Sequence, residues 1–345
     1  MPEFTAARSQ NADWLEQVRE DALEPDLPII DTHHHLWDRN GTFIQNRYLM
    51  DEIQADLSSG HNVVATVFVE CHAMYRADGP PEYAPVGEVE FVNGIAAMSA
   101  SGGFGPTRVA KAIIGHADLQ LGSKARGVLE ALQAAAPGRF RGIRHIGAWV
   151  DDPAVFTPAY VKGPGLYQDA SFREGLAELT SMGLLFETSI RHPQLPEFHE
   201  VARAFPDTRM VLNHIGGVVG VGSFAGRREE VFETWREGIQ AVGRDCPNVV
   251  VKLGALNMTY CGFGWEKRPK PPTSEELCEA TRRYYETVIE AFGPERCMFE
   301  SNFPVDKVSC SYGVLWNSFK RMTSGYSESE RAALFHDTAA RVYGI

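Results

Sequence analysis

The chain has 345 residues, of which 44% are hydrophobic and 10% aromatic, so it holds enough apolar material for one large domain or two ordinary ones. Its formal net charge of -12 at pH 7 argues against a nucleic-acid partner, because such proteins concentrate Lys and Arg against phosphates. A small anionic substrate is compatible with this charge, since a few arginines can dominate inside a pocket.

The cysteines and the hydropathy pattern point to the cytoplasm. The six cysteines are scattered singly, without the CxxC pair of a redox or metal motif. No apolar run approaches the roughly 20 residues that span a bilayer, and residues 1–27 are polar and charged, without the apolar core of a signal peptide. We expect a cytoplasmic protein without a membrane partner, and the sequence leaves a homo-oligomer open.

The first predicted elements are an N-terminal extension and a strand that carries histidines. Residues 1–27 predict an added helix and linker outside a main domain at 28–345. In the strand at 29–36, side chains alternate between faces, so Asp31, His33 and His35 share one face and His34 points to the other. Two imidazoles at this spacing can converge on one ion or one polarised carbonyl.

Short apolar, β-branched runs recur along the chain and predict eight strands. These runs cover 29–36, 63–70, 113–119, 140–149, 184–190, 210–215, 249–256 and 297–303. Helices are predicted at 123–136, 171–182, 195–204, 227–244, 274–292 and 327–343. The alternation is typical of an α/β fold with a parallel sheet, and it favours a (β/α)8 TIM barrel, which usually has about 250 residues before insertions.

Two features weigh against the alternative, an open doubly wound sheet. Such a sheet would carry a glycine-rich phosphate turn after its first strand, where this chain has histidines. The glycine-rich segment 216–226 matches neither GxGxxG nor a P-loop, and we interpret it as a flexible loop over a pocket. The long connections 73–107 and 257–273 are candidates for lids, with plain surface elaboration as the alternative.

Polar residues concentrate at the ends of the predicted strands, where a barrel gathers its chemistry. Most of the eleven histidines fall there. The strand-end set is His33, His35, Glu70, His72, His116, Asp118, Arg144, His145, Glu187, Arg191, His192, Asn213, His214, Lys252, Asn257, Glu300, Asn302, Asp306 and Lys307. For a single histidine such as His72, His116 or His145, a hydrogen-bonded structural role is at least as good an interpretation.

Four motifs carry a resemblance to a known family. They are DTHHHLW at 31–37, SIRHPQL at 189–195, LNHIGG at 212–217 and MFESNFP at 298–304. Together they resemble the amidohydrolase-related family of the amidohydrolase superfamily, and within it the branch of sugar lactonases and 2-pyrone-4,6-dicarboxylate lactonase. The resemblance runs from about residue 28 to the end and implies a barrel of the metal-dependent hydrolase type.

The resemblance also implies ligands for a divalent metal, commonly zinc. His33 and His35 match the HxH pair of the first strand, and His214 matches the histidine of the sixth. His192 lies near the fifth-strand ligand position, two residues beyond the strand. Neutral imidazoles suit zinc, which lowers the pKa of bound water toward 7. Some lactonases of the family use no metal, and there the same histidines would polarise the lactone carbonyl.

One departure from the family pattern concerns the general base. The eighth strand of the family usually ends Ser-Asp-Trp-Pro, whereas here Asn302 replaces the aspartate, and an amide cannot take a proton at physiological pH. Asp306, Glu300 and Glu70 are the candidate replacements. We favour Asp306, because the neighbouring Lys307 would favour its ionised form, although the two could also pair structurally.

Three residues are candidates for substrate binding. Arg144, at the end of the fourth strand, could bind a carboxylate bidentately. Lys252 lies within an apolar strand, so it must point into the barrel mouth, pair with a carboxylate or stay buried at a cost. His145 follows Arg144 and is the third candidate.

These residues predict an enzyme that hydrolyses a lactone or similar cyclic ester of a small carboxylated compound. One alternative is a metal-dependent decarboxylase of a hydroxylated aromatic acid, which the loss of the usual base at Asn302 favours. The other is a non-catalytic binding barrel. The joint presence of His33, His35, His192 and His214 argues against it, because a degenerate site loses its costly polar groups.

Overall fold

The computed structural model describes residues 11–39 and 46–345 and centres on one parallel sheet of eight strands. In sheet order the strands are β1 (Ile29–His34), β4 (Val63–Val69), β5 (Arg108–Gly115), β6 (Phe140–Arg144), β7 (Leu185–Thr188), β8 (Met210–Leu212), β9 (Val249–Leu253) and β10 (Cys297–Phe299). Neighbours in this order all pair in parallel. A two-stranded antiparallel ribbon follows β1 and consists of β2 (Trp37–Asp38) and β3 (Arg47–Tyr48).

Contacts just beyond the first and last strands close the ring. His34 forms a parallel bridge with Phe303. The His35 amide donates to the Phe303 carbonyl at 2.8 Å, and the Asn302 amide donates to the His33 carbonyl at 2.9 Å. The predicted (β/α)8 barrel is therefore confirmed, and the histidine-bearing end of β1 meets Asn302 and Phe303, which follow β10.

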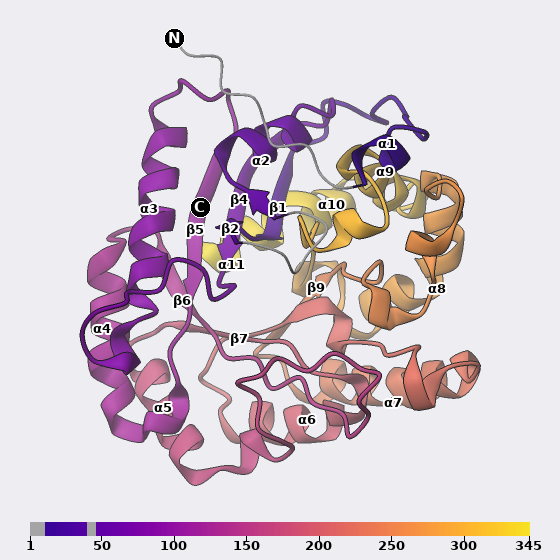
Figure 1. Cartoon of the computed structure of the whole chain (residues 1–345). Coiled ribbons are helices and arrows are strands. Elements are labelled where there is room, and N and C mark those ends of the chain that lie inside the picture. Colours follow the sequence, from indigo (N-terminus) through magenta and orange to yellow (C-terminus); the bar gives the residue numbers. More distant parts are fainter. Residues whose placement is uncertain (1–10, 40–45) are drawn as a thin grey trace.

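Most of the helices surround the strands on the outside, whereas α11 lies at one end of the barrel (Figure 1). They are α1 (Ala12–Leu15), α2 (Met50–Leu57), α3 (Val86–Ala100), α4 (Ala125–Ala135), α5 (Ala170–Ser181), α6 (Leu195–Ala204), α7 (Arg228–Asp245), α8 (Ser274–Phe292), α9 (Tyr312–Met322), α10 (Glu328–Ala332) and α11 (Thr338–Tyr343). A capping box starts α8, because Thr273 and Glu276 each accept the backbone N–H of the other. None of the described helices is long and apolar enough to cross a membrane.

Three of the described helices lie where no helix was predicted. These are α2, which follows the β2–β3 ribbon, α3 in the connection 73–107, and α9 after β10. The apolar pattern of α3 continues onto its outer side, where Met98 is 40% exposed, so it lacks the one-sided stripe that reveals an amphipathic helix. The strand predicted at 113–119 also begins earlier, at Arg108, and the one predicted at 140–149 ends at Arg144.

The barrel has an inner core that α11 closes from one end. Ile30, Val67 and Met298 point inward from three strands and are at most 2% exposed. Val342 and Tyr343 of α11 belong to the same cluster. The last helix therefore fills the end of the barrel opposite the strand ends that carry the histidines.

The described part of the N-terminal extension packs on the barrel helices. The Trp14 indole N–H donates to the Arg268 carbonyl at 2.9 Å, and Glu20 accepts from the Ser274 backbone at 2.7 Å. Residues 1–10 of the predicted extension lie outside the described residues. The division at residue 28 stays a prediction.

His61 predicts an acid-dependent loss of stability. Its Nδ1 accepts from Lys320 Nζ at 2.9 Å and its Nε2 donates to the Gly313 carbonyl at 3.1 Å. Burial, with the Lys320 charge, lowers the pKa of His61 to about 4. Because the unfolded chain takes up this proton near pH 6.5, we expect His61 to reduce the unfolding free energy by up to about 3 kcal/mol between pH 6.5 and 4.

Urea unfolding at pH 7, 5 and 4 measures this effect. His61→Gln should show a shallower decline than the wild type, and His336→Gln, at a half-buried position with a side chain that is 31% exposed, should show the wild-type decline. Equal pH dependence of the wild type and His61→Gln would contradict the assignment.

Candidate active site

A cavity of about 810 Å³ opens at the carboxyl ends of the strands. Its walls combine apolar and aromatic side chains with a few charged and imidazole groups. The polar and aromatic lining residues include His35, Trp37, Glu70, His72, Arg144, Tyr160, Arg191, His214, Tyr260 and Asn302. Cavities with this mixed lining are typical of small-molecule sites.

The end of β1 brings two imidazoles toward the cavity. The ring centroids of His33 and His35 lie 4.9 Å apart. The Nδ1–H of His35 donates to the Val69 carbonyl at 2.8 Å, which leaves the Nε2 lone pair free to accept. His34 makes a 2.8 Å hydrogen bond with Thr66 instead, in agreement with the predicted alternation of these three residues.

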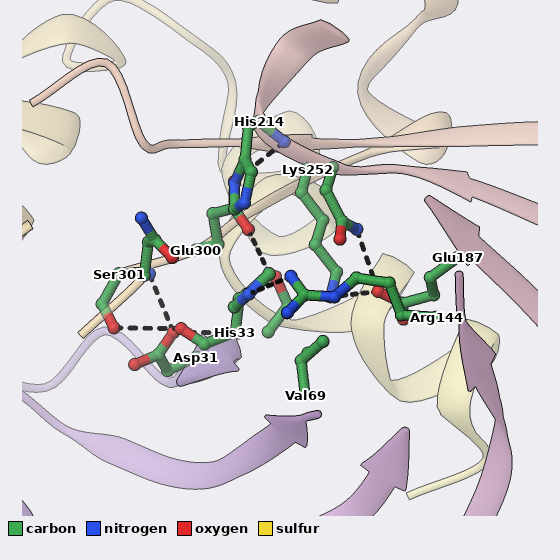
Figure 2. Close-up of polar contacts among 12 residues, drawn as sticks. Asp31, His33, Val69, Arg144, Glu187, His214, Lys252, Glu300 and Ser301 are labelled. Carbon is green, nitrogen blue, oxygen red and sulfur yellow. Dashed lines mark hydrogen bonds and ion pairs between the residues drawn. The ribbon is translucent and has the colours of Figure 1, made fainter. Parts of the chain in front are cut away.

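Asp31 departs from that alternation. Its Oδ1 accepts from the Ser301 amide at 2.9 Å (Figure 2). Its Oδ2 accepts from the Tyr312 hydroxyl at 3.0 Å. The register of β1 against β4 shifts between Asp31 and His34, and such an irregularity breaks the alternation of faces. Burial raises the pKa of Asp31 to about 6. Asp31 thus ties β1 to the end of β10 and does not line the cavity.

Glu300, which directly follows β10, joins histidines at the ends of β1 and β8. Its Oε2 lies 2.8 Å from His33 Nδ1, and its Oε1 lies 2.7 Å from His214 Nδ1 (Figure 2). The three residues offer ligand atoms within 4.8 Å of one another. We name His33, His214 and Glu300 the β1–β8–β10 cluster. Glu300 was predicted only as a possible base.

The β1–β8–β10 cluster fits a divalent metal. Within the described residues, His33 Nδ1 and Glu300 Oε2 are buried and make no hydrogen bond, although they lie 2.8 Å apart. Burial lowers the pKa of His33 and His214 well below its usual value, so both imidazoles are neutral and able to ligate. Two histidines and one carboxylate form a common zinc donor set.

The other two predicted metal ligands lie outside the cluster. His35 is adjacent to it and lines the cavity. His192 accepts from the Val219 amide at 3.3 Å and packs against Phe224, away from the cavity lining. His192 lies four residues beyond the end of β7, so the segment between them places its side chain beyond the cavity lining.

Arg144 connects the cluster to a second carboxylate. Its Nε donates to Glu70 Oε1 at 2.7 Å, and its Nη1 lies 3.2 Å from His33 Nε2. Burial alone would raise the pKa of Glu70, but the charge of Arg144, together with its hydrogen bond, outweighs burial and holds the pKa below its usual value. Glu70 is therefore ionised and faces the cavity.

Asn302 lines the cavity, whereas Asp306 lies behind it. Asn302 Nδ2 donates to Asp306 Oδ1 at 2.8 Å. Burial raises the pKa of Asp306 to about 8. Lys307 contacts Asp56 at 2.7 and 2.8 Å, so the prediction that Lys307 keeps Asp306 ionised was wrong: the side chain of Lys307 points outward to a different carboxylate.

Comparisons with known proteins identify the family. A model of the Amidohydrolase family matches residues 30–345. The chain belongs to the amidohydrolase family. It is 33% identical over 338 residues to a Sinorhizobium fredii protein named Uncharacterized protein y4mH, covering 93% of this chain and 99% of that protein. It is 27% identical over 235 residues to L-fucono-1,5-lactonase of Burkholderia multivorans, covering 68% of this chain and 71% of that protein.

Solved structures share the fold of this amidohydrolase. An amidohydrolase from Burkholderia multivorans with bound zinc aligns with a TM-score of 0.69 at 24% identity. The alignment covers 92% of this chain and 99% of that one.

Two candidate substrate-binding residues of this amidohydrolase lie away from the cavity lining. Lys252 Nζ donates to Glu187 Oε2 at 2.8 Å inside the barrel, and Tyr343 donates to the same carboxylate. Of the three arrangements considered for Lys252, the structure shows the pairing with a carboxylate. His145 accepts from the Leu119 amide at 3.3 Å and packs against aromatic rings.

The loop after β6 supplies cavity residues that the sequence analysis missed. Phe156, Pro158 and Tyr160 line the amidohydrolase cavity, although the loop was not marked as a binding segment. The sequence did contain an indication of a binding loop here, because residues 151–165 combine prolines, glycines and aromatics in a long connection. The predicted binding loop 257–273 contributes Tyr260, whereas the predicted pocket loop 216–226 does not line this cavity.

Proposed function

We propose that this amidohydrolase hydrolyses the ring ester of a lactone, or of a similar cyclic ester, in a small carboxylated compound. The observation that carries the proposal is the meeting of neutral imidazoles, an ionised carboxylate and three arginines, Arg39, Arg144 and Arg191, at one cavity. A relative named L-fucono-1,5-lactonase supports lactone chemistry. The family resemblance of the strand-end motifs supports it as well.

Two arginines favour an anionic substrate. Arg144 and Arg191 both line the cavity. The guanidinium of Arg191 lies over the Tyr260 ring at 4.0 Å and donates to the Phe156 carbonyl at 2.9 Å, which fixes its position. Its buried Nε makes no hydrogen bond within the described residues. A planar guanidinium with a donor to spare suits a substrate carboxylate.

The reaction needs a proton acceptor and a group that stabilises charge on oxygen. Among Glu70, Glu300 and Asp306, Glu70 is the carboxylate that lines the cavity in the described part of the chain. We propose that Glu70 Oε2 accepts the proton of the attacking water. The N–H groups of Arg144, which Glu70 holds in place, stabilise the developing oxyanion.

The β1–β8–β10 cluster would hold the metal ion that the family implies. With His33, His214 and Glu300 as ligands, a bound ion such as zinc would supply Lewis acidity to the carbonyl and lower the pKa of water. Asn302 lines the same cavity and offers its amide to the substrate. The Val69 carbonyl accepts from the Nδ1–H of His35. The Nε2 of His35 can therefore accept a hydrogen bond from the substrate and orient it.

A panel of carboxylated lactones tests this proposal, with acid release followed by a pH indicator. We expect turnover that a chelator removes and added zinc restores, with elemental analysis before and after chelation. Turnover that survives complete metal removal would contradict the proposed role of a metal ion and would leave the proposed hydrolysis standing. Release of carbon dioxide from hydroxylated aromatic acids, without acid release from lactones, would replace the proposal with a decarboxylase. Tight binding without turnover would indicate a binding barrel.

A further inference from the structure

A second group of metal-ligating side chains lies at the ends of β4 and β5. Glu70, His72 and His116 offer ligand atoms within 4.8 Å of one another. None of the three was predicted as a metal ligand, and they are distinct from the residues of the β1–β8–β10 cluster. We name them the β4–β5 cluster.

We propose that the β4–β5 cluster is a second site for a divalent transition-metal ion. Glu70 Oε2 and His72 Nε2 lie 3.3 Å apart. Both atoms are buried, and neither makes a hydrogen bond within the residues that the structure describes. The Glu70 side chain is fully buried, so its free oxygen points at the two histidines and not at bulk solvent.

The tautomer of His116 leaves a ligand atom available. Its Nδ1 lies 3.0 Å from the carbonyl oxygen of Arg144, which can only accept, so Nδ1 carries the proton. The Nε2 lone pair is then free. Histidine ligands are commonly oriented in this way, by donating the other ring N–H to a carbonyl.

Glu88 of α3 holds the loop that carries His72. Its Oε1 accepts from the backbone N–H of Cys71 at 3.0 Å and of Ala73 at 2.8 Å, one residue on either side of His72. The ring of Tyr160 stacks on the His72 ring at a centroid distance of 4.2 Å. The hydrogen bonds to the loop backbone and the stacked Tyr160 ring therefore both fix the position of the His72 imidazole, as is expected of a ligand in a preorganised site.

The charges around the cluster also favour a cation. Glu70 and Glu88 are both fully buried, and Arg144 makes an ion pair with Glu70. Burial, with the nearby Glu70 charge, raises the pKa of Glu88 to about 8. Its Oε2 makes no hydrogen bond in the described part of the chain. A carboxyl with this pKa is mostly protonated at pH 7, so Glu70 supplies the negative charge that a bound dication would meet.

Arg144 keeps the two clusters separate, because its guanidinium contacts Glu70 on one side and His33 on the other. His72 lines the cavity and its side chain is 28% exposed, so an ion can enter from the cavity and keep a position open toward it. Two nitrogens and one carboxylate suit zinc, cobalt or nickel. One consequence rests on the proposed function: an ion on Glu70 would remove the proton acceptor, so excess metal would inhibit turnover.

Cobalt binding to the full chain tests the second site without any assay of activity. After chelation, calorimetry and the visible absorption of Co²⁺ report the number of ions bound. We expect two Co²⁺ per wild-type chain and one for His72→Ala. In a His33→Ala background, which dismantles the β1–β8–β10 cluster, we expect one ion, and adding His72→Ala should weaken its binding on the order of 100-fold or more.

His116→Ala is the second variant, and His199→Ala is the matched control, since His199 pairs with Asp245 on α7. Circular dichroism checks that each variant folds. Unchanged Co²⁺ binding in both His72→Ala and His116→Ala would overturn the second site, as would an equal loss in His199→Ala. These experiments measure metal binding and not lactone turnover. Their outcome is therefore independent of whether the proposed function is correct.

Discussion

Replacing His33 and His35 together by alanine is expected to lower kcat on lactones by about 10⁴-fold or more. His33 lies between Glu300 and Arg144, at 2.8 and 3.2 Å, so its loss disrupts the metal ligands and frees the arginine at once. His35 supplies a further imidazole at the cavity wall. Steady-state kinetics on the best lactone of the panel gives the measurement.

His34 provides the matched control for this experiment. It lies between the two histidines in the same strand and is equally buried, but it bonds to Thr66 on the other face. His34→Ala should lose stability and keep kcat within about 10-fold of the wild type, an effect smaller than that of a lost acid–base group. Wild-type rates in a folded His33→Ala/His35→Ala variant would refute the assigned role of these imidazoles.

Lys252→Met is expected to lower the unfolding free energy by about 3–5 kcal/mol, because it leaves the buried Glu187 carboxylate without its cation. The Lys252 and Glu187 side chains are both fully buried and lie 2.8 Å apart. Asn213 and Tyr343 donate to the same carboxylate, but neutral donors cannot replace the positive charge.

Chemical denaturation of Lys252→Met, Glu187→Gln and the double variant gives the coupling between the two residues. We expect the double variant to recover most of the loss of Lys252→Met, since it buries no unpaired charge. Lys267→Met, at a side chain that is 81% exposed, controls for the loss of a lysine charge. A loss below about 1 kcal/mol in Lys252→Met, the size of an exposed ion pair, would contradict the argument.

The sequence predicts the barrel because strand runs and helical runs alternate in a pattern that parallel sheets require. It also predicts that His33 and His214 belong to one site, since strand ends in a closed barrel meet. It did not reveal α3, whose residues are apolar on more than one side, and so it missed Glu88, which holds the loop of His72.

The contacts of the carboxylates were harder to predict, because each depends on a partner distant in sequence. Glu300 bonds to His214, which is 86 residues away, and Asn302 rather than Lys307 contacts Asp306. Adjacency in sequence suggested the pairing of Asp306 with Lys307, yet in the 3-10 helix Asp306–Val308 these two neighbouring side chains point to different sides. Lys307 therefore reaches Asp56 of α2.

The closure of the ring between β1 and β10 has a consequence for the folding of this chain. Ser301 bonds to Asp31 across 270 residues of sequence, and Tyr343 reaches Glu187 across 156. Contacts of such long range slow folding, because a large loop must close before they stabilise anything. During synthesis, β1 can pair early with β4, but its edge that faces β10 must wait for nearly all of the chain, so this open edge is the part of the sheet most in need of a chaperone.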